Sequence, residues 1–251
     1  GDRRSVSRRR GDAVAVQPQH VALPRRPGQL DGLQLRPRLS RVIAAEVRGL
    51  AHFAEQLVAN YETDPDARWL LDYHQLHLVV HANPDGRRVA ETGASKRKNT
   101  NTTQGSCTQT TWGVDLNRNS TFDWNQGGSS TSACNETYMG RSAASEPETQ
   151  ALENYILSLF ADRRGPGASD AAPADTSGLV VSLHSYGGWV LYPWATTTAL
   201  APNSTQLRTL GRKFNYFNGY EACQVATCLY TASGSTDAFA YGRLGVAAYT
   251  I

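Results

Sequence analysis

The sequence predicts an α/β fold, because helical and strand-like patterns alternate along the chain after residue 43. The apolar content of 40% is ordinary for a globular protein, and 251 residues suit one large α/β domain or two small ones. No stretch approaches the roughly 18 consecutive apolar residues of a membrane-spanning helix, so no membrane span is expected.

The first elements are predicted between residues 44 and 86. Apolar residues recur at three- and four-residue spacing over 44–61, which predicts an amphipathic helix. An Asp-Pro pair starts a short helical segment over 64–71. The run QLHLVVHA, residues 75–82, predicts a strand, and the Asn-Pro-Asp-Gly sequence at 83–86 predicts a turn.

A long polar segment, 87–145, separates these elements from the rest of the fold. It is rich in Ser, Thr, Asn and Gly, and so long an irregular segment in a compact domain is usually functional. The sequence Ser145-Glu-Pro-Glu148 then has the polar cap, first-turn proline and acids of a helix start, which predicts a helix through Phe160. The remaining elements are a linker at 164–177, strands at 179–183 and 189–192, a helix at 203–217 and a strand at 246–251.

The net charge of +3 is unevenly distributed. Residues 1–50 contain 11 Arg, no Lys, four acids and no aromatic residue, a net of +7, whereas the rest of the chain carries −4. Residues 1–43 are expected to be a disordered linker or a stretch that does not belong to the fold, such as a translated wrong frame. A nucleic-acid-binding arm is the weaker alternative, because such arms usually mix Lys with Arg and include aromatics. The folded domain is expected over 44–251.

The four cysteines fall into two plausible pairs, Cys107 with Cys134 and Cys223 with Cys228. None has a zinc-binding CxxC spacing, and their polar surroundings favour disulfides over buried free thiols. The sequence has no signal-peptide core of apolar residues near its start. The cysteine pattern nevertheless favours a secreted or periplasmic protein.

Several polar residues are candidates for chemistry. His184 follows an apolar strand, and the carboxyl ends of strands are where open α/β sheets bind ligands, so it could be a metal ligand or catalytic group; a structural histidine is the alternative. Asn117-Arg118 offers an amide and a planar guanidinium suited to a carboxylate, and Arg97 could stabilise an oxyanion. Surface salt bridges or solvated charges are the alternatives for these residues. His74, His77 and His81 lack an accompanying carboxylate and are interpreted as strand histidines, with His77 and His81 on one face.

Eight motifs in order resemble the zinc metallocarboxypeptidases of the carboxypeptidase A/B/T type, over about residues 44–251. They are Asn83-Pro-Asp-Gly86, Arg97-Lys-Asn99, Gly113–Asn119 (GVDLNRN), Cys134–Gly140, Ser145–Glu148, His184-Ser-Tyr, Tyr192-Pro193 and Tyr230–Gly234. The resemblance implies one three-layer α/β/α domain with a mixed, mostly parallel sheet, here truncated at both ends. It also implies a zinc-dependent exopeptidase that releases C-terminal amino acids.

The resemblance assigns roles to individual residues of this chain. His184 is similar to the third zinc ligand, and Asn117 and Arg118 to the pair that holds the terminal carboxylate of the substrate. Arg97 resembles the residue that stabilises the oxyanion, and Tyr230 the tyrosine that closes over the terminal residue. Asp237 falls where the family sets its specificity, and an acid there implies a preference for C-terminal Lys or Arg. Cys107–Cys134 matches a disulfide of the family.

Two parts of the family's catalytic apparatus do not match. The family's H-x-x-E motif has no match at its aligned position, where its two zinc ligands fall on Ser40 and Ile43, with Val42 in place of the motif's arginine. The catalytic Glu would follow Ile251. One zinc ligand of three is therefore expected, and the chain as given is expected not to hydrolyse peptides. The alternative is a non-catalytic relative that binds C-terminal carboxylates. The expected partners are peptide or protein C-termini, with no nucleic acid and no membrane, and the protein is expected to be a monomer.

Overall fold

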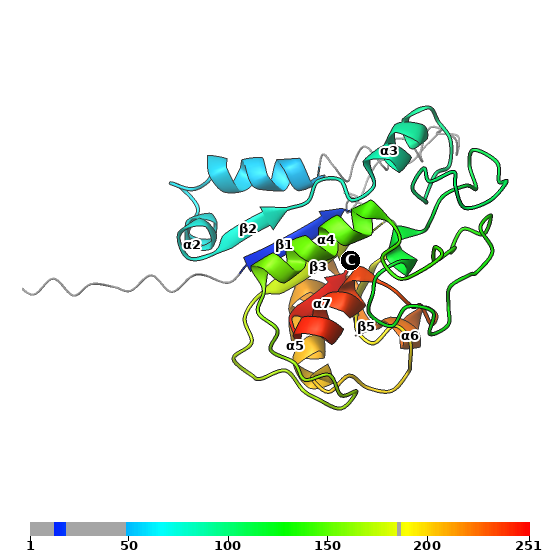
Figure 1. The fold of residues 1–251 in the computed structure, drawn as a ribbon. Helices are drawn as coiled ribbons and strands as arrows, with labels where there is room; N and C mark the ends of the chain where they lie inside the picture. Colours follow the sequence, from blue (N-terminus) through cyan, green and yellow to red (C-terminus); the bar gives the residue numbers. More distant parts are fainter. Residues whose placement is uncertain (1–12, 19–48, 185–186) are drawn as a thin grey trace, which may run out of the picture.

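The computed structural model describes residues 13–18, 49–184 and 187–251, which form one sheet with helices on both faces (Figure 1). The sheet has six strands in the order β2-β1-β3-β6-β4-β5. Their bounds are Ala13–Pro18 (β1), Gln75–Leu78 (β2), Leu179–Leu183 (β3), Trp189–Tyr192 (β4), Glu221–Gln224 (β5) and Ala247–Thr250 (β6).

All neighbouring strands run parallel except β4 and β6, which are antiparallel and meet at Leu191 and Thr250. The sheet is thus mixed and mostly parallel, as the sequence predicted. The parallel strands β1, β3 and β6 share one direction, so their carboxyl ends lie at the same edge of the sheet. Chemistry-bearing residues that follow these strands are therefore brought together.

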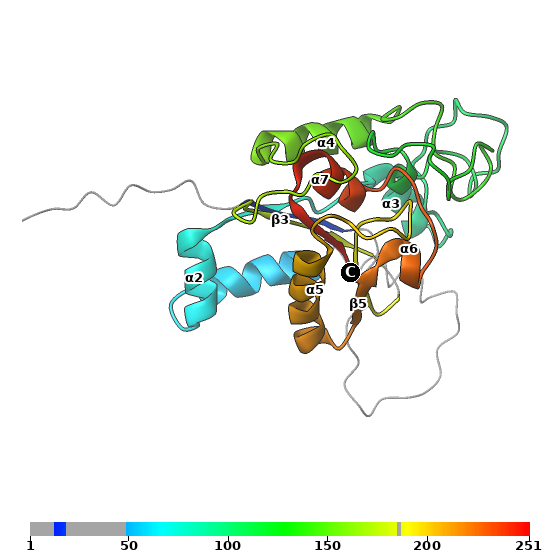
Figure 2. The ribbon, with the colours of Figure 1, turned by 90° about the horizontal axis from the view of Figure 1, so that it is seen from below.

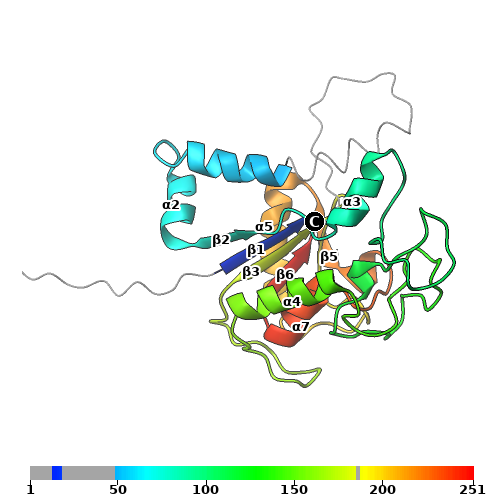
Figure 3. The same cartoon turned by 45° about the horizontal axis from the view of Figure 1, so that its top comes forward.

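Two helical layers cover the sheet. The helices are residues 49–59, Pro65–Tyr73 (α2), Pro84–Glu91 (α3), Pro147–Leu159 (α4), Ser204–Asn218 (α5), Val225–Cys228 (α6) and Thr236–Leu244 (α7). Figure 2 shows α4 and α7 on one face, and α5, α2 and the 49–59 helix on the other. The same layers are seen in Figure 3. The three-layer α/β/α arrangement is confirmed.

Strand β1 lies within the segment that was expected to be outside the fold. Its residues pair with β2, where Val14 faces Leu76, and with β3, where Val14 faces Leu179, so β1 is an interior strand. The run Ala13–Val16 is short and wholly apolar, which suits a strand paired on both sides, but such a run carries little periodic signal. The expectation for residues 1–43 is therefore corrected at 13–18, and its remainder lies outside the described residues.

Several other elements differ from the predicted ones. Residues 83–86, expected to be a turn, begin helix α3: the Asn83 side chain accepts a hydrogen bond from Gly86 N at 3.0 Å, and Pro84 occupies the first turn. Asparagine followed by proline is suited to a turn and to a helix start alike. Strand β2 ends at Leu78, so His81 is not on it and shares no strand face with His77. β5, α6 and α7 were not predicted.

The predicted strands at 179–183 and 189–192 match β3 and β4, and the predicted final strand contains β6. The main core packs the inner faces of β3, β4 and β6 against α4, α5 and α7. Its fully buried residues include Val180, Val190, Tyr241 and Tyr249, and Tyr249 Oη donates to Leu207 O at 2.7 Å. No helix among the described residues is long and apolar enough to cross a membrane.

The polar segment 94–145 gathers at the end of the sheet toward which β1 and β2 run (Figure 1). Two buried carboxylates at α4 fasten it. Glu146 accepts hydrogen bonds from Asn99 and Asn101, and Glu153 accepts from Ser120 Oγ at 2.6 Å and from the Thr121 backbone at 2.8 Å. Charge-assisted bonds of this kind are stronger than neutral ones, so this irregular segment has a defined geometry.

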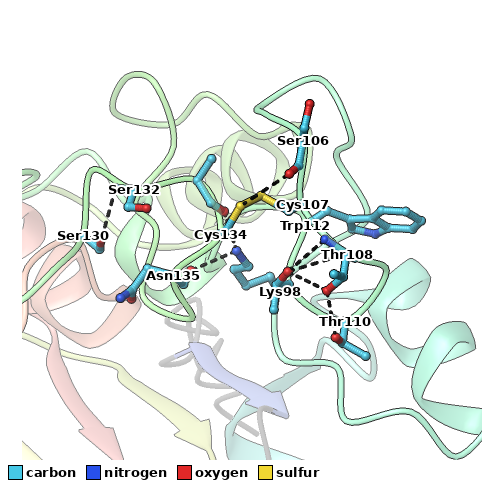
Figure 4. Close-up of a disulfide and its surroundings, with 12 residues drawn as sticks. Lys98, Ser106, Cys107, Thr108, Thr110, Trp112, Ser130, Ser132, Cys134 and Asn135 are labelled. Carbon is cyan, nitrogen blue, oxygen red and sulfur yellow. Dashed lines mark hydrogen bonds between the residues drawn. A yellow bond between two sulfur atoms is a disulfide. The ribbon is translucent and has the colours of Figure 1, made fainter.

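Both expected disulfides are present, Cys107–Cys134 and Cys223–Cys228. Beside the first lies the buried Lys98, whose ammonium donates to the carbonyl oxygens of Ala133 at 2.7 Å and Asn135 at 2.9 Å (Figure 4). Lys98 and the disulfide thus tie the same two parts of the polar segment together.

We expect removal of the Cys107–Cys134 bridge to destabilise the protein more than removal of Cys223–Cys228. The bridged cysteines are 27 residues apart in Cys107–Cys134 and 5 residues apart in Cys223–Cys228. The loop-closure entropy that a disulfide removes from the unfolded state corresponds to a stabilisation of about 3.5 kcal/mol for the longer loop and about 2 kcal/mol for the shorter one. Urea unfolding of the two double Cys→Ser variants measures both losses. A larger loss for Cys223–Cys228 would contradict this expectation.

Candidate functional site

A cavity of about 190 Å³ lies at the carboxyl edge of β3 and β6. It is lined by all six candidate residues of the sequence analysis, which are Arg97, Asn117, Arg118, His184, Tyr230 and Asp237. Its apolar wall is formed by residues of β4, α6 and the loops beside them, including Leu191, Ala195, Val225 and Leu229. The cavity therefore combines an apolar surface with two arginines and a carboxylate, the composition of a small-ligand site.

Arg97 reaches the cavity from a loop whose flanking lysines are buried. Its Nε donates a hydrogen bond to Oδ2 of Asp115 at 3.0 Å, and its Nη2 lies 2.9 Å from the same oxygen in an ion pair. Asp115 is almost fully buried, whereas a third of the Arg97 side chain is exposed. The ion pair with Asp115 raises the pKa of Arg97, so the guanidinium is a permanent cation.

Asn117 and Arg118 lie on a 3-10 turn, Leu116–Arg118, capped by the same Asp115. Asp115 Oδ1 accepts from Asn117 N at 3.1 Å, and Asn117 Oδ1 accepts from Thr236 N at 3.5 Å. Because the oxygen of the Asn117 amide faces Thr236, Nδ2 is the donor that this side chain can offer to a ligand.

Arg118 is buried, and its Nη1 donates to the Asn117 carbonyl oxygen at 2.7 Å. Its Nε is buried and has no hydrogen-bond partner in the part of the chain that the structure describes. The half-exposed Tyr230 ring lies with its centroid 5.9 Å from the guanidinium carbon. A buried N–H without a partner is costly, and it indicates a position where a ligand acceptor would be favourable.

Gly234 allows the loop after Tyr230 to approach Arg118 closely. It has a φ of +71°, and a Cβ there would lie 2.4 Å from the Arg118 carbonyl oxygen. Both the left-handed backbone and the contact exclude a side chain. The close approach sets Tyr230 and the start of α7 beside the arginine.

Asp237 lies in the first turn of α7 and is 3% exposed. Its Oδ2 has no hydrogen-bond partner within the described residues. Burial raises the pKa of Asp237, while Ser235, nearby backbone N–H groups and the positive charge of Arg118 act in the opposite direction. A buried carboxylate with an unpaired oxygen at the wall of a cavity is suited to bind a cation.

His184 follows β3 at the cavity edge. Its Nε2 lies 2.9 Å from Ser182 Oγ, and its backbone N–H donates to Ile251 O at 2.6 Å. Ser185 and Tyr186, which belong to the same motif, lie outside the described residues.

His74, His77 and His81, the three histidines near β2, do not line the cavity. His77 Nδ1 lies 2.8 Å from the Tyr155 hydroxyl of α4, and His74 packs its ring against Trp69. Burial lowers the pKa of His81, and the nearby Arg87 acts in the same direction. His77 thus joins the sheet edge to α4, a structural contact.

Comparison with known proteins identifies the family of this chain. The sequence model described as "Zinc carboxypeptidase" matches residues 46–251. The chain belongs to the zinc carboxypeptidase family. Zinc carboxypeptidase A 1 of Drosophila melanogaster is 32% identical over 70% of this chain and 38% of its own length. Carboxypeptidase B of Bos taurus is 29% identical over 76% of this chain and 43% of its own length.

Solved structures agree with this family. The carboxypeptidase A of Helicoverpa armigera has a TM-score of 0.70 and 25% identity, covering 96% of this chain and 51% of that one. Thrombin activatable fibrinolysis inhibitor, at 18% identity, shares the fold with a TM-score of 0.72. The chain therefore spans about half, or less than half, of the length of these relatives.

The described residues of this zinc carboxypeptidase chain do not fit a zinc ion. Zinc sites in proteins use three or four His, Cys, Asp or Glu side chains, and no group of three that could hold a metal occurs among the described residues. His184 is the one expected ligand within them, and Ser40 and Ile43, at the positions expected for the other two, lie outside.

The sequence analysis gave no role to Asp115, which lies within the GVDLNRN motif and contacts Arg97 and Asn117. An Asp immediately before a turn is a typical capping signal, which could have indicated its contact with Asn117 N, two residues further on. Its contact with Arg97, 18 residues away, leaves no local signal. The apolar wall was missed because α6 was not predicted.

The burial of the loop that contains Arg97 can be tested through Lys96, the residue that precedes it. It is 4% exposed and donates to the Trp112 carbonyl oxygen. Burial, assisted by the nearby Lys98, lowers the pKa of Lys96 from its ordinary 10.5 to about 8. Between these two values the unfolded chain binds more protons than the folded one, so this lysine makes stability increase with pH.

We therefore expect the free energy of unfolding of the wild type, minus that of Lys96→Met, to increase from about pH 8 to 10.5. Urea unfolding at five pH values measures the difference. Lys98 and Tyr138 also have shifted pKa values but are present in both proteins, so their contributions largely cancel. A difference that stays constant over this range would contradict the buried placement of Lys96.

Proposed function

We propose that the cavity binds the C-terminal residue of a peptide or protein, the recognition that zinc-dependent removal of that residue requires. The observation that carries the proposal is the meeting of Arg97, Asn117, Arg118, Tyr230 and Asp237 at one cavity. They come from three separate parts of the chain, and each offers a group that complements one part of a C-terminal residue.

The terminal carboxylate is assigned to Arg118 and Asn117. The Arg118 Nε has no partner in the described structure, and the Asn117 oxygen is committed to Thr236, so both side chains can donate to the same anion. A carboxylate held by a guanidinium fork has strong, directional hydrogen bonds. Only a chain end offers such a carboxylate next to a peptide bond, which makes this arrangement selective for C-termini.

The side chain of the terminal residue is assigned to Asp237, which favours Lys or Arg. A ligand cation would pair with Oδ2, the buried oxygen without a partner in the described residues, and would offset the cost of burying that charge. Leu191 and Val225 would contact the aliphatic stem of the ligand side chain.

Arg97 is assigned to the carbonyl oxygen of the last peptide bond, where it would stabilise negative charge, and Tyr230 to covering the bound residue. The exposed third of Arg97 lies at the cavity, and the Tyr230 ring is 57% exposed, so both can reach a ligand. A half-exposed aromatic ring beside a cavity gains buried area when the ligand binds.

Recognition and hydrolysis are separable in this chain. The positions expected for the family's two H-x-x-E ligands hold Ser40 and Ile43, and the one H-x-x-E run of the sequence, His52–Glu55, does not line the cavity. We therefore propose that this chain binds C-termini without cleaving them. In a second candidate function the chain is a non-catalytic relative whose own role is this binding, which Ser40 and Ile43 at the expected ligand positions and the retained anion-binding residues favour. The two disulfides favour secretion or a periplasmic location, and we expect a monomer.

Calorimetry with three ligands, in buffer containing EDTA, tests the proposed recognition. N-benzoylglycyl-arginine should bind, its C-terminal amide should bind at least tenfold more weakly, and N-benzoylglycyl-phenylalanine should be weaker than the arginine acid. Equal affinities of the acid and the amide would contradict recognition of the carboxylate. Equal affinities of the arginine and phenylalanine acids would contradict the role of Asp237.

Hydrolysis is tested separately, with the same arginine acid and added zinc. We expect no release of arginine, measured by chromatography over a day. Release of arginine that stops when EDTA is added would contradict the proposed separation of binding from cleavage.

A further inference from the structure

We propose that Asp115 is a positioning residue that couples the two anion-binding parts of the cavity. The inference rests on the proposed function and deepens it. One carboxylate contacts both parts: Oδ2 accepts from Arg97, and Oδ1 accepts from the backbone of Asn117. Asp115 does not line the cavity, so it acts through these residues and does not touch the ligand.

The contact with Arg97 fixes how the guanidinium faces the ligand. Oδ2 of Asp115 accepts a hydrogen bond from Nε at 3.0 Å and lies 2.9 Å from Nη2, so the ion pair is on one edge of the planar group. Nη1 takes no part in this contact, and because Arg97 lines the cavity, we assign Nη1 to the ligand. An arginine without this contact would have several rotatable bonds free and would spend less time in the binding orientation.

The contact with Asn117 fixes the other part of the site. Asp115 is the cap of the 3-10 turn, and that turn presents Asn117 and Arg118 to the cavity. Backbone bonds hold the cap itself in place, since Asp115 N donates to Tyr138 O at 2.8 Å and Arg118 N donates to Asp115 O at 2.8 Å. Because the Asp115 carboxylate is buried and its backbone is held, it fixes the position of Arg97 relative to the turn that contains Asn117 and Arg118.

The two contacts differ in what they require, which allows them to be tested apart. The cap needs only an acceptor oxygen, which an amide also provides. The ion pair with Arg97 needs the negative charge, which an amide lacks. Asp115→Asn therefore keeps the cap and removes the charge that orients Arg97.

The experiment uses two ligands, N-benzoylglycyl-arginine and an analogue whose last peptide bond is replaced by a tetrahedral phosphonate. Calorimetry in EDTA-containing buffer gives the ratio of their affinities, which reports how well Arg97 meets the added negative oxygen. We expect Asp115→Asn to reduce the wild-type preference for the phosphonate by about tenfold, while the preference for the arginine acid over its amide is kept.

A double-mutant cycle separates positioning from simple destabilisation. If Asp115 acts through Arg97, Asp115→Asn causes no further loss of phosphonate preference in an Arg97→Met background. A further loss of similar size in that background, or an unchanged preference in the single variant, would overturn the proposal. Failure of the wild type to prefer the arginine acid over its amide would instead contradict the proposed function.

Glu153→Gln is the matched control. Glu153 is also a buried carboxylate that holds the same segment, through Ser120 Oγ and Thr121 N, but it has no recorded contact with Arg97. It should lower the unfolding midpoint and leave the phosphonate preference unchanged. A preference reduced equally in Glu153→Gln would show that loss of loop stability alone explains the Asp115 effect.

Discussion

Replacing Arg118 with methionine is expected to lower the affinity for N-benzoylglycyl-arginine by at least a hundredfold. The substitution removes a buried guanidinium whose Nε has no partner in the described residues and whose Nη1 is held by the Asn117 carbonyl oxygen. Truncating one partner of a buried charge pair costs about 2–5 kcal/mol, partly because the other charge is left unpaired. Calorimetry measures the change, and affinity for the amide should fall much less.

Two further variants keep this prediction testable if Arg118→Met is unstable. Arg118→Lys keeps the charge but loses the planar fork, so we expect an intermediate affinity for the acid. Arg243→Met removes an exposed cation of α7 that pairs with Asp162, and it should leave affinity unchanged. An acid affinity that is the same in Arg118→Lys, Arg118→Met and the wild type would exclude Arg118 from the carboxylate site.

The second large effect is expected for Asp237→Asn, in opposite directions for binding and stability. Affinity for the arginine acid should fall at least tenfold, whereas the phenylalanine acid should bind as well as before or better. The protein should become more stable at pH 7 by about 1 kcal/mol or more, because a buried carboxylate oxygen without a partner among the described residues is replaced by a neutral group. Calorimetry and thermal unfolding measure the two changes.

The same residue predicts a pH dependence. Burial raises the pKa of Asp237 above its ordinary 3.8, so its folded-state contribution to stability is present at low pH and is lost as pH rises through the raised value. Affinity for the arginine acid should increase over that range, since only the ionised carboxylate pairs with the ligand cation. His184 also lines the cavity and is present in both proteins, so the comparison is made against Asp237→Asn. An identical pH dependence in both proteins would contradict the assignment.

The residues that line the cavity could be named in advance because they are concentrated in short motifs. Residue types singled out Arg97, Asn117 and Arg118, the resemblance to the family added Tyr230 and Asp237, and the structure brings all five to one cavity. Asp115 could be seen within its motif, but its bond to Arg97 is a long-range contact that local patterns do not encode. The apolar wall of the cavity was not predicted either, because its residues also meet through long-range contacts.

The fold was predictable where strands and helices carry clear periodicity. β3, β4 and α4 match their predicted ranges within two residues, because a buried strand and a capped amphipathic helix leave strong local signals. Helix α7 was missed because nearly all its residues are buried, so no polar face marks its period. Strand β1 was missed because its short apolar run lies in a segment whose arginines and prolines suggested no structure.

A crystal structure of the chain with N-benzoylglycyl-arginine bound tests the central claim most directly. The ligand carboxylate should lie within hydrogen-bond distance of Arg118 and Asn117, with the ligand guanidinium against Asp237 and Tyr230 over the bound residue. A ligand bound outside this cavity, or bound within it with the carboxylate away from Arg118, would contradict the proposed recognition of C-termini.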